Sequence, residues 1–127
     1  MDIDRLKARF ANPPSEFTFA PFWFLNHELE DDELKWQINE MYTNGVKGVI
    51  LHPRHGLITE YLSDQWFDRM ETCIKECDRL GMKVYLYDEN NWPSGTVDGK
   101  LIEEYPEYRL AGCVMSQRFQ VSGGKRI

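Results

Sequence analysis

Apolar residues follow two different spacings along this chain. Within residues 31–45 and 63–81 they recur every three or four positions, which is typical of a helix with one buried face. Within residues 17–25, 48–51 and 83–87 they form short, nearly continuous runs, which is typical of strands covered on both faces. The pattern therefore predicts strand, helix, strand, helix, strand. The short links favour parallel strands joined by crossover helices.

Both predicted helices have clear start and stop signals. Asp31 or Asp32 in the first helix, and Ser63 in the second, can accept hydrogen bonds from the first backbone N–H groups. Gly45 and Gly81 end the helices, because glycine adopts the left-handed conformation there at no steric cost. The buried faces are predicted to consist of Leu34, Ile38, Met41 and Tyr42 in the first helix and Trp66, Met70, Cys73 and Cys77 in the second.

The chain is predicted to have three parts, which are the α/β unit and the segments before and after it. Residues 1–16 form a lead-in that the Asn-Pro-Pro-Ser sequence ends, and residues 17–109 hold the α/β unit. Residues 110–127 are interpreted as the start of a further β element or of an inserted domain. In this last part, the alternation over residues 110–121 predicts one long strand, followed by a glycine turn.

Two short helical segments are expected beside the α/β unit. Ile3, Leu6 and Phe10 have helical spacing, so the lead-in is predicted to begin with a short amphipathic turn. Asp98 could cap another short helix over residues 100–105, which the following proline ends.

The third strand runs directly into Asp88 and Glu89, and the two-residue period of a strand gives them opposite faces. Asp88 is in phase with the aliphatic Leu86, whereas Glu89 is in phase with Tyr87. Because covering helices favour aliphatic residues, we expect Glu89 to face the cleft, with a pKa raised by burial among aromatic rings. It could then act as a general acid or base, or bind substrate hydroxyls. A carboxylate that pairs with Arg54 or with a loop amide is the alternative.

The second strand leads into a segment with two histidines. By the same two-residue period, Leu51 faces the helices and His52 faces away from them. His52, Arg54 and His55 could hydrogen-bond a ligand or only build the loop. We predict no metal site, because no further ligands with suitable spacing accompany the two histidines.

Candidate ligand-binding residues gather at the carboxyl ends of all three strands, which meet at one edge of a parallel sheet. Flat aromatic rings beside amides, acids and imidazoles suit a sugar, whose ring combines apolar C–H faces with hydroxyl groups. The predicted catalytic residue is Glu89, and the predicted substrate-binding residues are Trp23, Asn26, His52, Arg54, His55, Asp88, Asn91 and Trp92. For Trp23, a place in the core is the alternative.

Charge and composition exclude several classes of function. The net charge of −6, with no basic stripe, argues against nucleic-acid binding. No apolar stretch is long enough to span a membrane, and the first residues do not resemble a signal peptide, so we expect a cytoplasmic protein. Three cysteines without a C-x-x-C pair fit core thiols in a reducing compartment better than a disulfide scaffold.

Four segments in order resemble the start of the catalytic barrel in glycoside hydrolases of the α-L-rhamnosidase type (family 106). They are Pro-Phe-Trp-Phe-Leu-Asn at 21–26, the helix and strand over 37–50, Tyr-Leu-Ser-Asp-Gln-Trp at 61–66, and Tyr-Asp-Glu with Trp-Pro-Ser-Gly over 87–95. The resemblance covers residues 21–109. It departs from the family after Gly95, where a small residue and paired glycines are replaced by Thr-Val-Asp-Gly.

The resemblance implies that residues 17–109 are a partial (β/α)8 TIM barrel with only its first three strands. It also implies hydrolysis of rhamnose-containing or related glycans with inversion, and calcium as a possible cofactor in some members. Inversion requires two carboxyl groups, and the partner of Glu89 would come from later strands. We therefore expect a piece that is inactive alone, whose open sheet edge the rest of a barrel or an oligomer partner covers.

Two other functions remain open from the sequence. A non-catalytic α/β module could bind a carbohydrate or a partner chain without chemistry. A different barrel hydrolase, such as a β-galactosidase-like enzyme, would also place acids and aromatic rings at the ends of its strands.

Overall fold

The computed structural model describes residues 2–14, 17–113 and 120. Two helices and three strands form the main body, with shorter helices before and after it. In chain order the elements are α1 (Ile3–Ala11), β1 (Phe22–His27), α2 (Asp31–Thr43), β2 (Gly48–Leu57), α3 (Asp64–Leu80), β3 (Lys83–Leu86), α4 (Lys100–Glu104) and the 3-10 helix η2 (Pro106–Tyr108).

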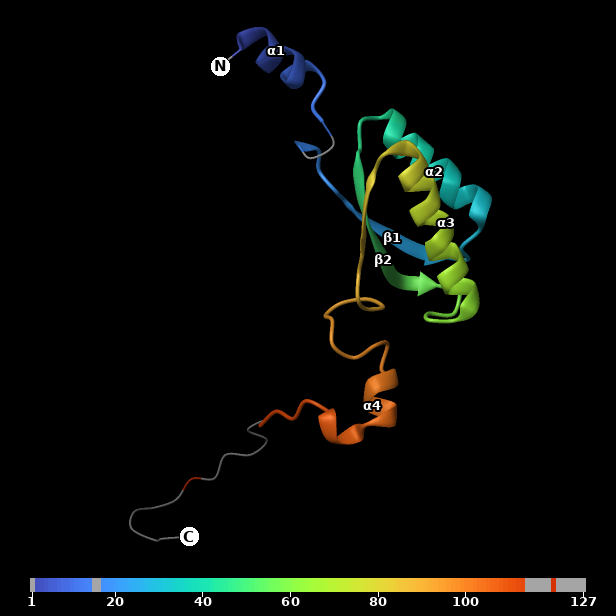
Figure 1. The fold of residues 1–127 in the computed structure, drawn as a ribbon. Helices are drawn as coiled ribbons and strands as arrows, with labels where there is room; N and C mark the ends of the chain where they lie inside the picture. Colours follow the sequence, from blue (N-terminus) through green and yellow to red (C-terminus); the bar gives the residue numbers. More distant parts are fainter. Residues whose placement is uncertain (1, 15–16, 114–119, 121–127) are drawn as a thin grey trace.

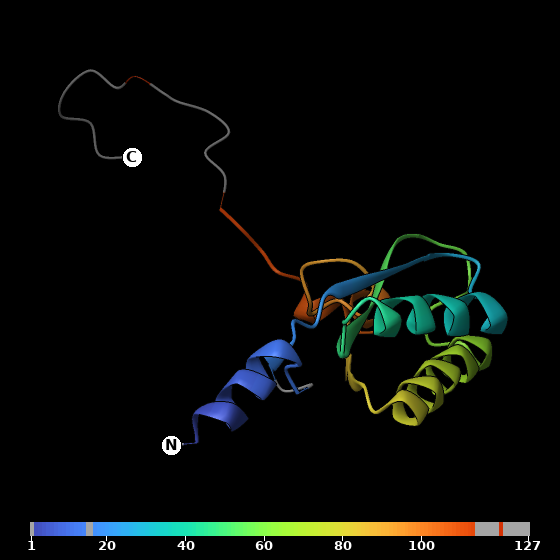
Figure 2. The ribbon, with the colours of Figure 1, turned by 90° about the horizontal axis from the view of Figure 1, so that it is seen from above.

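The three strands form one parallel sheet in the order β1-β2-β3, so each strand pairs with the strand before it in the chain. Trp23 pairs with Leu51, and Leu51 pairs with Leu86, in a continuous register across the sheet. Both crossover helices, α2 and α3, lie on the same side of this sheet (Figures 1 and 2). The predicted β-α-β-α-β unit is therefore confirmed as a small α/β domain with an open sheet.

The core lies between the sheet and the two helices. The helix faces predicted from periodicity supply most of it, with Met41 and Tyr42 only partly buried at its margin. Its buried members include Leu25, Val49 and Leu51 from the strands, Leu34 and Ile38 from α2, and Met70, Cys73 and Cys77 from α3. The predicted phase of the second strand is thus confirmed, because Val49 and Leu51 face the helices.

The other side of the sheet carries aromatic residues instead of helices. Phe22, Phe24 and Tyr85 point to this side, and about half of each side chain is exposed. We call this side the open face. At the edge strand β3, Leu86 is also 58% exposed, although its phase directs it toward the helical side.

Several predicted boundaries differ from the structure. β1 begins at Phe22, since residues 17–21 are extended or turned without strand pairing. β2 continues through the predicted loop at 52–56, because His27 of β1 pairs with Leu57 across an irregular register. Gly99 takes the N-cap position of α4, and Asp98 makes no side-chain cap there.

α1 and the described residues after η2 lie outside the core. α1 forms as predicted, with Asp2 capping it by accepting hydrogen bonds from the backbone N–H groups of Asp4 and Arg5. It has no buried residue and lies away from the sheet (Figure 1). Residues 110–113 and 120 are not in a strand. The rest of the strand predicted over 110–121 falls outside the described residues.

A polar cluster joins the two crossover helices. Glu76 of α3 accepts hydrogen bonds from Asn39 of α2 and from Arg79, whose Nη2 lies 2.6 Å from Glu76 Oε1. The hydrogen bonds from Arg79 and then Asn39 lower the pKa of Glu76 to about 2, against the smaller opposing effect of burial. Glu76 therefore stays mainly ionised in the folded protein at a pH equal to its ordinary pKa of 4.5, where a free glutamate is half protonated.

We expect the variant Glu76→Gln to change the acid stability of the domain. The folded-state pKa is lowered from 4.5 to about 2, so the stabilisation is fully present above pH 4.5 and is lost as the pH falls toward 2. At neutral pH the variant should lose less than about 1 kcal/mol, because the Arg79 end of the cluster is exposed. Urea denaturation at pH 7 and pH 3 measures this difference.

The matched control is Glu71→Gln, which removes only an exposed pair with Lys75. A destabilisation by Glu76→Gln that is equal at pH 7 and pH 3 would contradict the assignment of the acid sensitivity to this cluster.

Candidate functional site

The most distinctive feature at the carboxyl end of the sheet is Glu89, whose side chain is 0% exposed. Five backbone N–H groups donate hydrogen bonds to its two carboxylate oxygens. The donors are Asn90, Gly95, Thr96, Val97 and Asp98, at N···O distances of 2.9, 3.0, 2.7, 2.6 and 2.7 Å. We call residues 90–98 the Glu89 loop, because this one carboxylate joins both of its ends.

These hydrogen bonds decide the charge of Glu89. Burial alone would raise the pKa of the carboxyl, but the backbone donors, led by Asp98 and Thr96, together outweigh it and lower the pKa. The raised pKa expected from the sequence is therefore wrong. β3 ends at Leu86, so the two-residue period does not extend to Glu89. Its carboxylate points into the loop and accepts from loop amides, which was the alternative interpretation of this residue from the sequence.

The Glu89 loop contains backbone conformations that need support. Asn91, Val97 and Asp98 have φ values of 70°, 53° and 57°. Such values are uncommon for residues other than glycine, and most of all for a β-branched residue such as Val97. Because Val97 and Asp98 both donate to Glu89, the carboxylate stabilises the strained part of the loop.

Asp88 is the accessible carboxylate at the end of β3. Its side chain is exposed, and its Oδ1 lies 2.8 Å from Ser94 Oγ. Ser94 Oγ also lies 3.1 Å from the hydroxyl of Tyr87, so a small cluster of hydroxyl groups adjoins this acid. The six-residue separation of Ser94 from Asp88 carries no recognisable motif, so the sequence alone gave no sign of this contact.

His52 lies on the open face, as its phase predicts, but only 2% of it is exposed. Its ring is 5.3 Å from those of Phe22 and Phe24 and 4.0 Å from that of Tyr87. Among the described residues, its buried Nδ1 has no hydrogen-bond partner. Burial and then the charge of Arg54 lower the pKa of His52, against a hydrogen bond with the Asn91 backbone. The imidazole is therefore neutral at pH 7.

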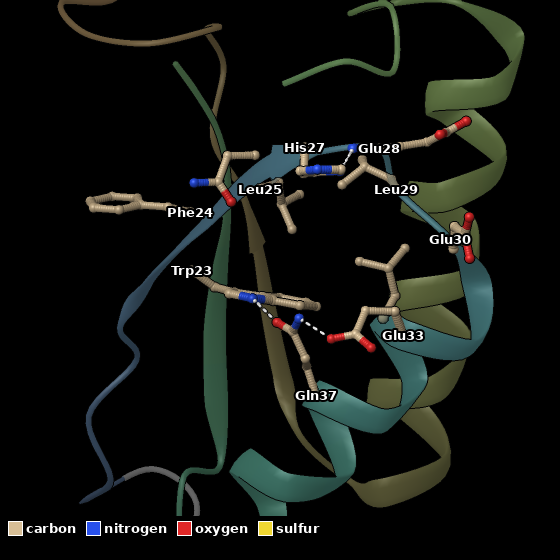
Figure 3. Close-up of a pocket in the computed structure, with 11 residues that line it drawn as sticks. Trp23, Phe24, Leu25, His27, Glu28, Leu29, Glu30, Glu33 and Gln37 are labelled. Atoms are coloured by element: carbon tan, nitrogen blue, oxygen red, sulfur yellow. Dashed lines mark hydrogen bonds between the residues drawn. The ribbon is translucent and has the colours of Figure 1, made fainter. Parts of the chain in front are cut away.

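Trp23 lies on the opposite side of the sheet from His52. It pairs with Leu51, which faces the helices, whereas Phe24 pairs with His52. The indole Nε1 donates to Gln37 Oε1 at 2.9 Å, and Gln37 Nε2 donates to Glu33 Oε1 at 2.7 Å (Figure 3). Together they line a cavity of about 260 Å³ between β1 and the start of α2. Gln37 and Glu33 were not among the predicted site residues, although their i, i+4 spacing places them on one side of α2.

The remaining predicted residues surround the end of the sheet. Asn26 and His55 are exposed, and Arg54 lies over the ring of Phe24 at 5.2 Å. Asn91 donates its backbone N–H to Pro53 at 3.0 Å, which fixes the Glu89 loop to β2. The side chain of Trp92 is 73% exposed. The structure thus brings the second half of β2 and the residues after β3 together, and it separates Trp23 from them.

Among the described residues, no group of three or more His, Cys, Asp or Glu side chains is arranged to hold a metal ion, so we assign no residue to the calcium that the resemblance implies. None of the helices in this part of the chain has the length and apolar character needed to cross a membrane.

Comparison with family models, with curated proteins and with solved structures gives no match for this chain. The residues at the strand ends are therefore the basis for any assignment. They combine an exposed acid, a neutral histidine, an arginine and an exposed indole within one edge of a parallel sheet.

Proposed function

We propose that this chain forms the first three strands of a (β/α)8 barrel in a glycoside hydrolase that acts on rhamnose-containing or related glycans. In this proposal the chain contributes one part of the glycan-binding site and is inactive alone. The one-sided covering of the sheet by helices is the observation that supports it most directly.

A barrel accounts for the two unlike faces of the sheet. In a (β/α)8 barrel, consecutive parallel strands are neighbours, their helices all lie outside, and side chains from the other face fill the interior. The same arrangement is found here, because the strands follow the order β1-β2-β3 and the helices α2 and α3 lie on one side of the sheet. Further strands beside β3 would cover Tyr85 and Leu86, which are now exposed on its two faces.

The polar groups at the strand ends suit a sugar ligand. The exposed indole of Trp92 can stack on the C–H face of a sugar ring, while Asp88 and Arg54 can bind hydroxyl groups. Inverting hydrolysis needs two carboxyl groups with room for water between them. After β3, backbone N–H groups bind both carboxylate oxygens of Glu89, so only the carboxylate of Asp88 is accessible there. In this proposal, at least one catalytic carboxyl group therefore comes from later strands.

We expect L-rhamnose and aryl α-L-rhamnosides to bind near Trp92 without being hydrolysed. In an NMR titration, amide signals of residues 88–98 should shift, and Trp92→Ala should weaken binding about tenfold, or about 1.4 kcal/mol. The control is Trp36→Ala, which removes an exposed indole from α2. Turnover of an aryl rhamnoside by the chain alone would contradict the proposed incomplete site, and the absence of any shift would contradict glycan binding.

The second candidate is a non-catalytic carbohydrate- or partner-binding module. It is favoured because backbone N–H groups already bind the Glu89 carboxylate, which leaves it unavailable for catalysis. The genomic sequence that follows the codon for Ile127 distinguishes the two. Further strand–helix units there support the barrel, whereas an unrelated domain or a stop codon supports the module.

A further inference from the structure

The backbone of the Glu89 loop is an anion-binding site that the chain fills with its own side chain. Four consecutive residues, 95–98, direct their N–H groups at a single carboxylate, and Asn90 adds a fifth donor from the other end of the loop. Successive backbone N–H groups that converge in this way form a concave site for anions. In phosphate-binding loops the anion is a ligand, whereas here it is Glu89.

Other hydrogen bonds hold parts of the loop: Asn91 donates to Pro53, Ser94 donates to Asp88, and the carbonyls of Thr96 and Val97 accept from the start of α4. Among the described residues, only Glu89 accepts from the N–H groups of residues 95–98. Val97 packs against the core, but most side chains of residues 92–98 are exposed. Without the carboxylate, the converging N–H groups would lose their acceptor while remaining close to one another. The loop would then have no compensation for the positive φ values of Val97 and Asp98.

The same loop sets the position of the residues that would meet a ligand. Asn91 is joined to β2, because its backbone N–H donates to the carbonyl oxygen of Pro53 at 3.0 Å. Trp92 follows at once, with its ring in solvent. A change in the loop therefore moves Trp92 relative to Arg54 and Asp88.

We propose that Glu89 is a positioning residue: its carboxylate fills the backbone anion site of residues 90–98 and so fixes Trp92 and Asn91 at the carboxyl end of the sheet. It does not exchange protons with a substrate. The statement about the loop stands on its own, and the identity of the ligand rests on the proposed function.

The test uses the full chain with Glu89→Ala and measures amide hydrogen exchange by NMR. Exchange at Gly95, Thr96, Val97 and Asp98 should become about 100-fold faster, because each amide loses a charged acceptor. Acetate has the atoms that the substitution removes, so added acetate should restore protection, whereas chloride at equal ionic strength should not. Asp88→Ala is the matched control and should leave these four amides protected.

Three outcomes would overturn the proposal. They are unchanged exchange at residues 95–98 in Glu89→Ala, no response to acetate, or faster exchange spread evenly over β1, β2 and β3. If Glu89→Ala does not fold, Glu89→Gln replaces it, because glutamine keeps one acceptor oxygen and the side-chain volume. With that variant, faster exchange confined to the loop supports the proposal, and unchanged exchange overturns it.

A second measurement separates the loop from its ligand. The fluorescence change of Trp92 on adding L-rhamnose, isolated by comparison with Trp92→Phe, should be lost in Glu89→Ala and return with acetate. A change that persists in Glu89→Ala without acetate would overturn the positioning role. If the unaltered chain gives no change with rhamnose while the exchange results hold, the proposed function fails and Glu89 still holds the loop.

Discussion

Replacing Glu89 with glutamine is expected to lower the free energy of unfolding by about 2–4 kcal/mol at pH 7. Glutamine has nearly the same shape, so the loss arises from chemistry rather than from packing. The glutamine amide has no charge. Its NH₂ group replaces a carboxylate oxygen, so the backbone N–H groups that donate to that oxygen lose their acceptor. Chemical denaturation followed by far-UV circular dichroism measures the difference.

This loss should depend on pH in a defined direction. The pKa of Glu89 is lowered in the folded state, so its stabilisation is fully present above the ordinary value of 4.5 and disappears as the pH falls below it. The unaltered chain and the variant should therefore become more alike in acid. Glutamine does not titrate, so the variant lacks this part of the pH dependence.

Asp88→Asn is the control, because it makes the same chemical change one residue earlier in the chain. The side chain of Asp88 is exposed, and asparagine retains an oxygen that can accept from Ser94, so we expect a change within about 0.5 kcal/mol. Equal effects of the two substitutions would contradict the central place of Glu89 in the loop.

Replacing Ile38 with alanine is expected to lower the free energy of unfolding by about 2–5 kcal/mol. Ile38 is 0% exposed and lies in the core between α2, α3 and the sheet. Among the described residues, helices cover only one face of the sheet, so this layer supplies most of the buried apolar side chains. A domain of this size has few other contacts to offset the cavity.

Thermal and urea unfolding of Ile38→Ala test this expectation, with Ile58→Ala as the matched control. Ile58 follows β2 and 62% of it is exposed, so the same substitution removes little buried surface there. A comparable loss at both positions would argue against a core that is confined to the helical side of the sheet.

The parts of the fold that depend on regular spacing could be predicted from the sequence. The periodicity of α2 and α3 identified their buried faces, and Ser63 caps α3 as expected, by accepting from the Trp66 N–H. The alternation of Leu51 and His52 gave the correct faces of β2. These signals are local, because they follow from helix and strand geometry alone.

The parts that depend on contacts between distant segments could not be predicted. The extension of β2 requires β1 to pair with it after an irregularity at Leu25 and His27, which no local pattern indicates. The orientation of Glu89 depends on residues 95–98 folding back over it. Trp23 was grouped with the site because it ends a strand, although its phase with Leu25 already placed it on the helical side.

The order of the strands also bears on how the chain folds during its synthesis. Among the described strands, pairing occurs only between strands that are consecutive in the chain, so no pairing has to wait for a distant segment. The β1-α2-β2 unit can assemble while α3 is still in the ribosomal tunnel, and β3 can then join a finished edge. Short separations between pairing segments speed folding, so the parallel sheet should form early and in steps from the N-terminus.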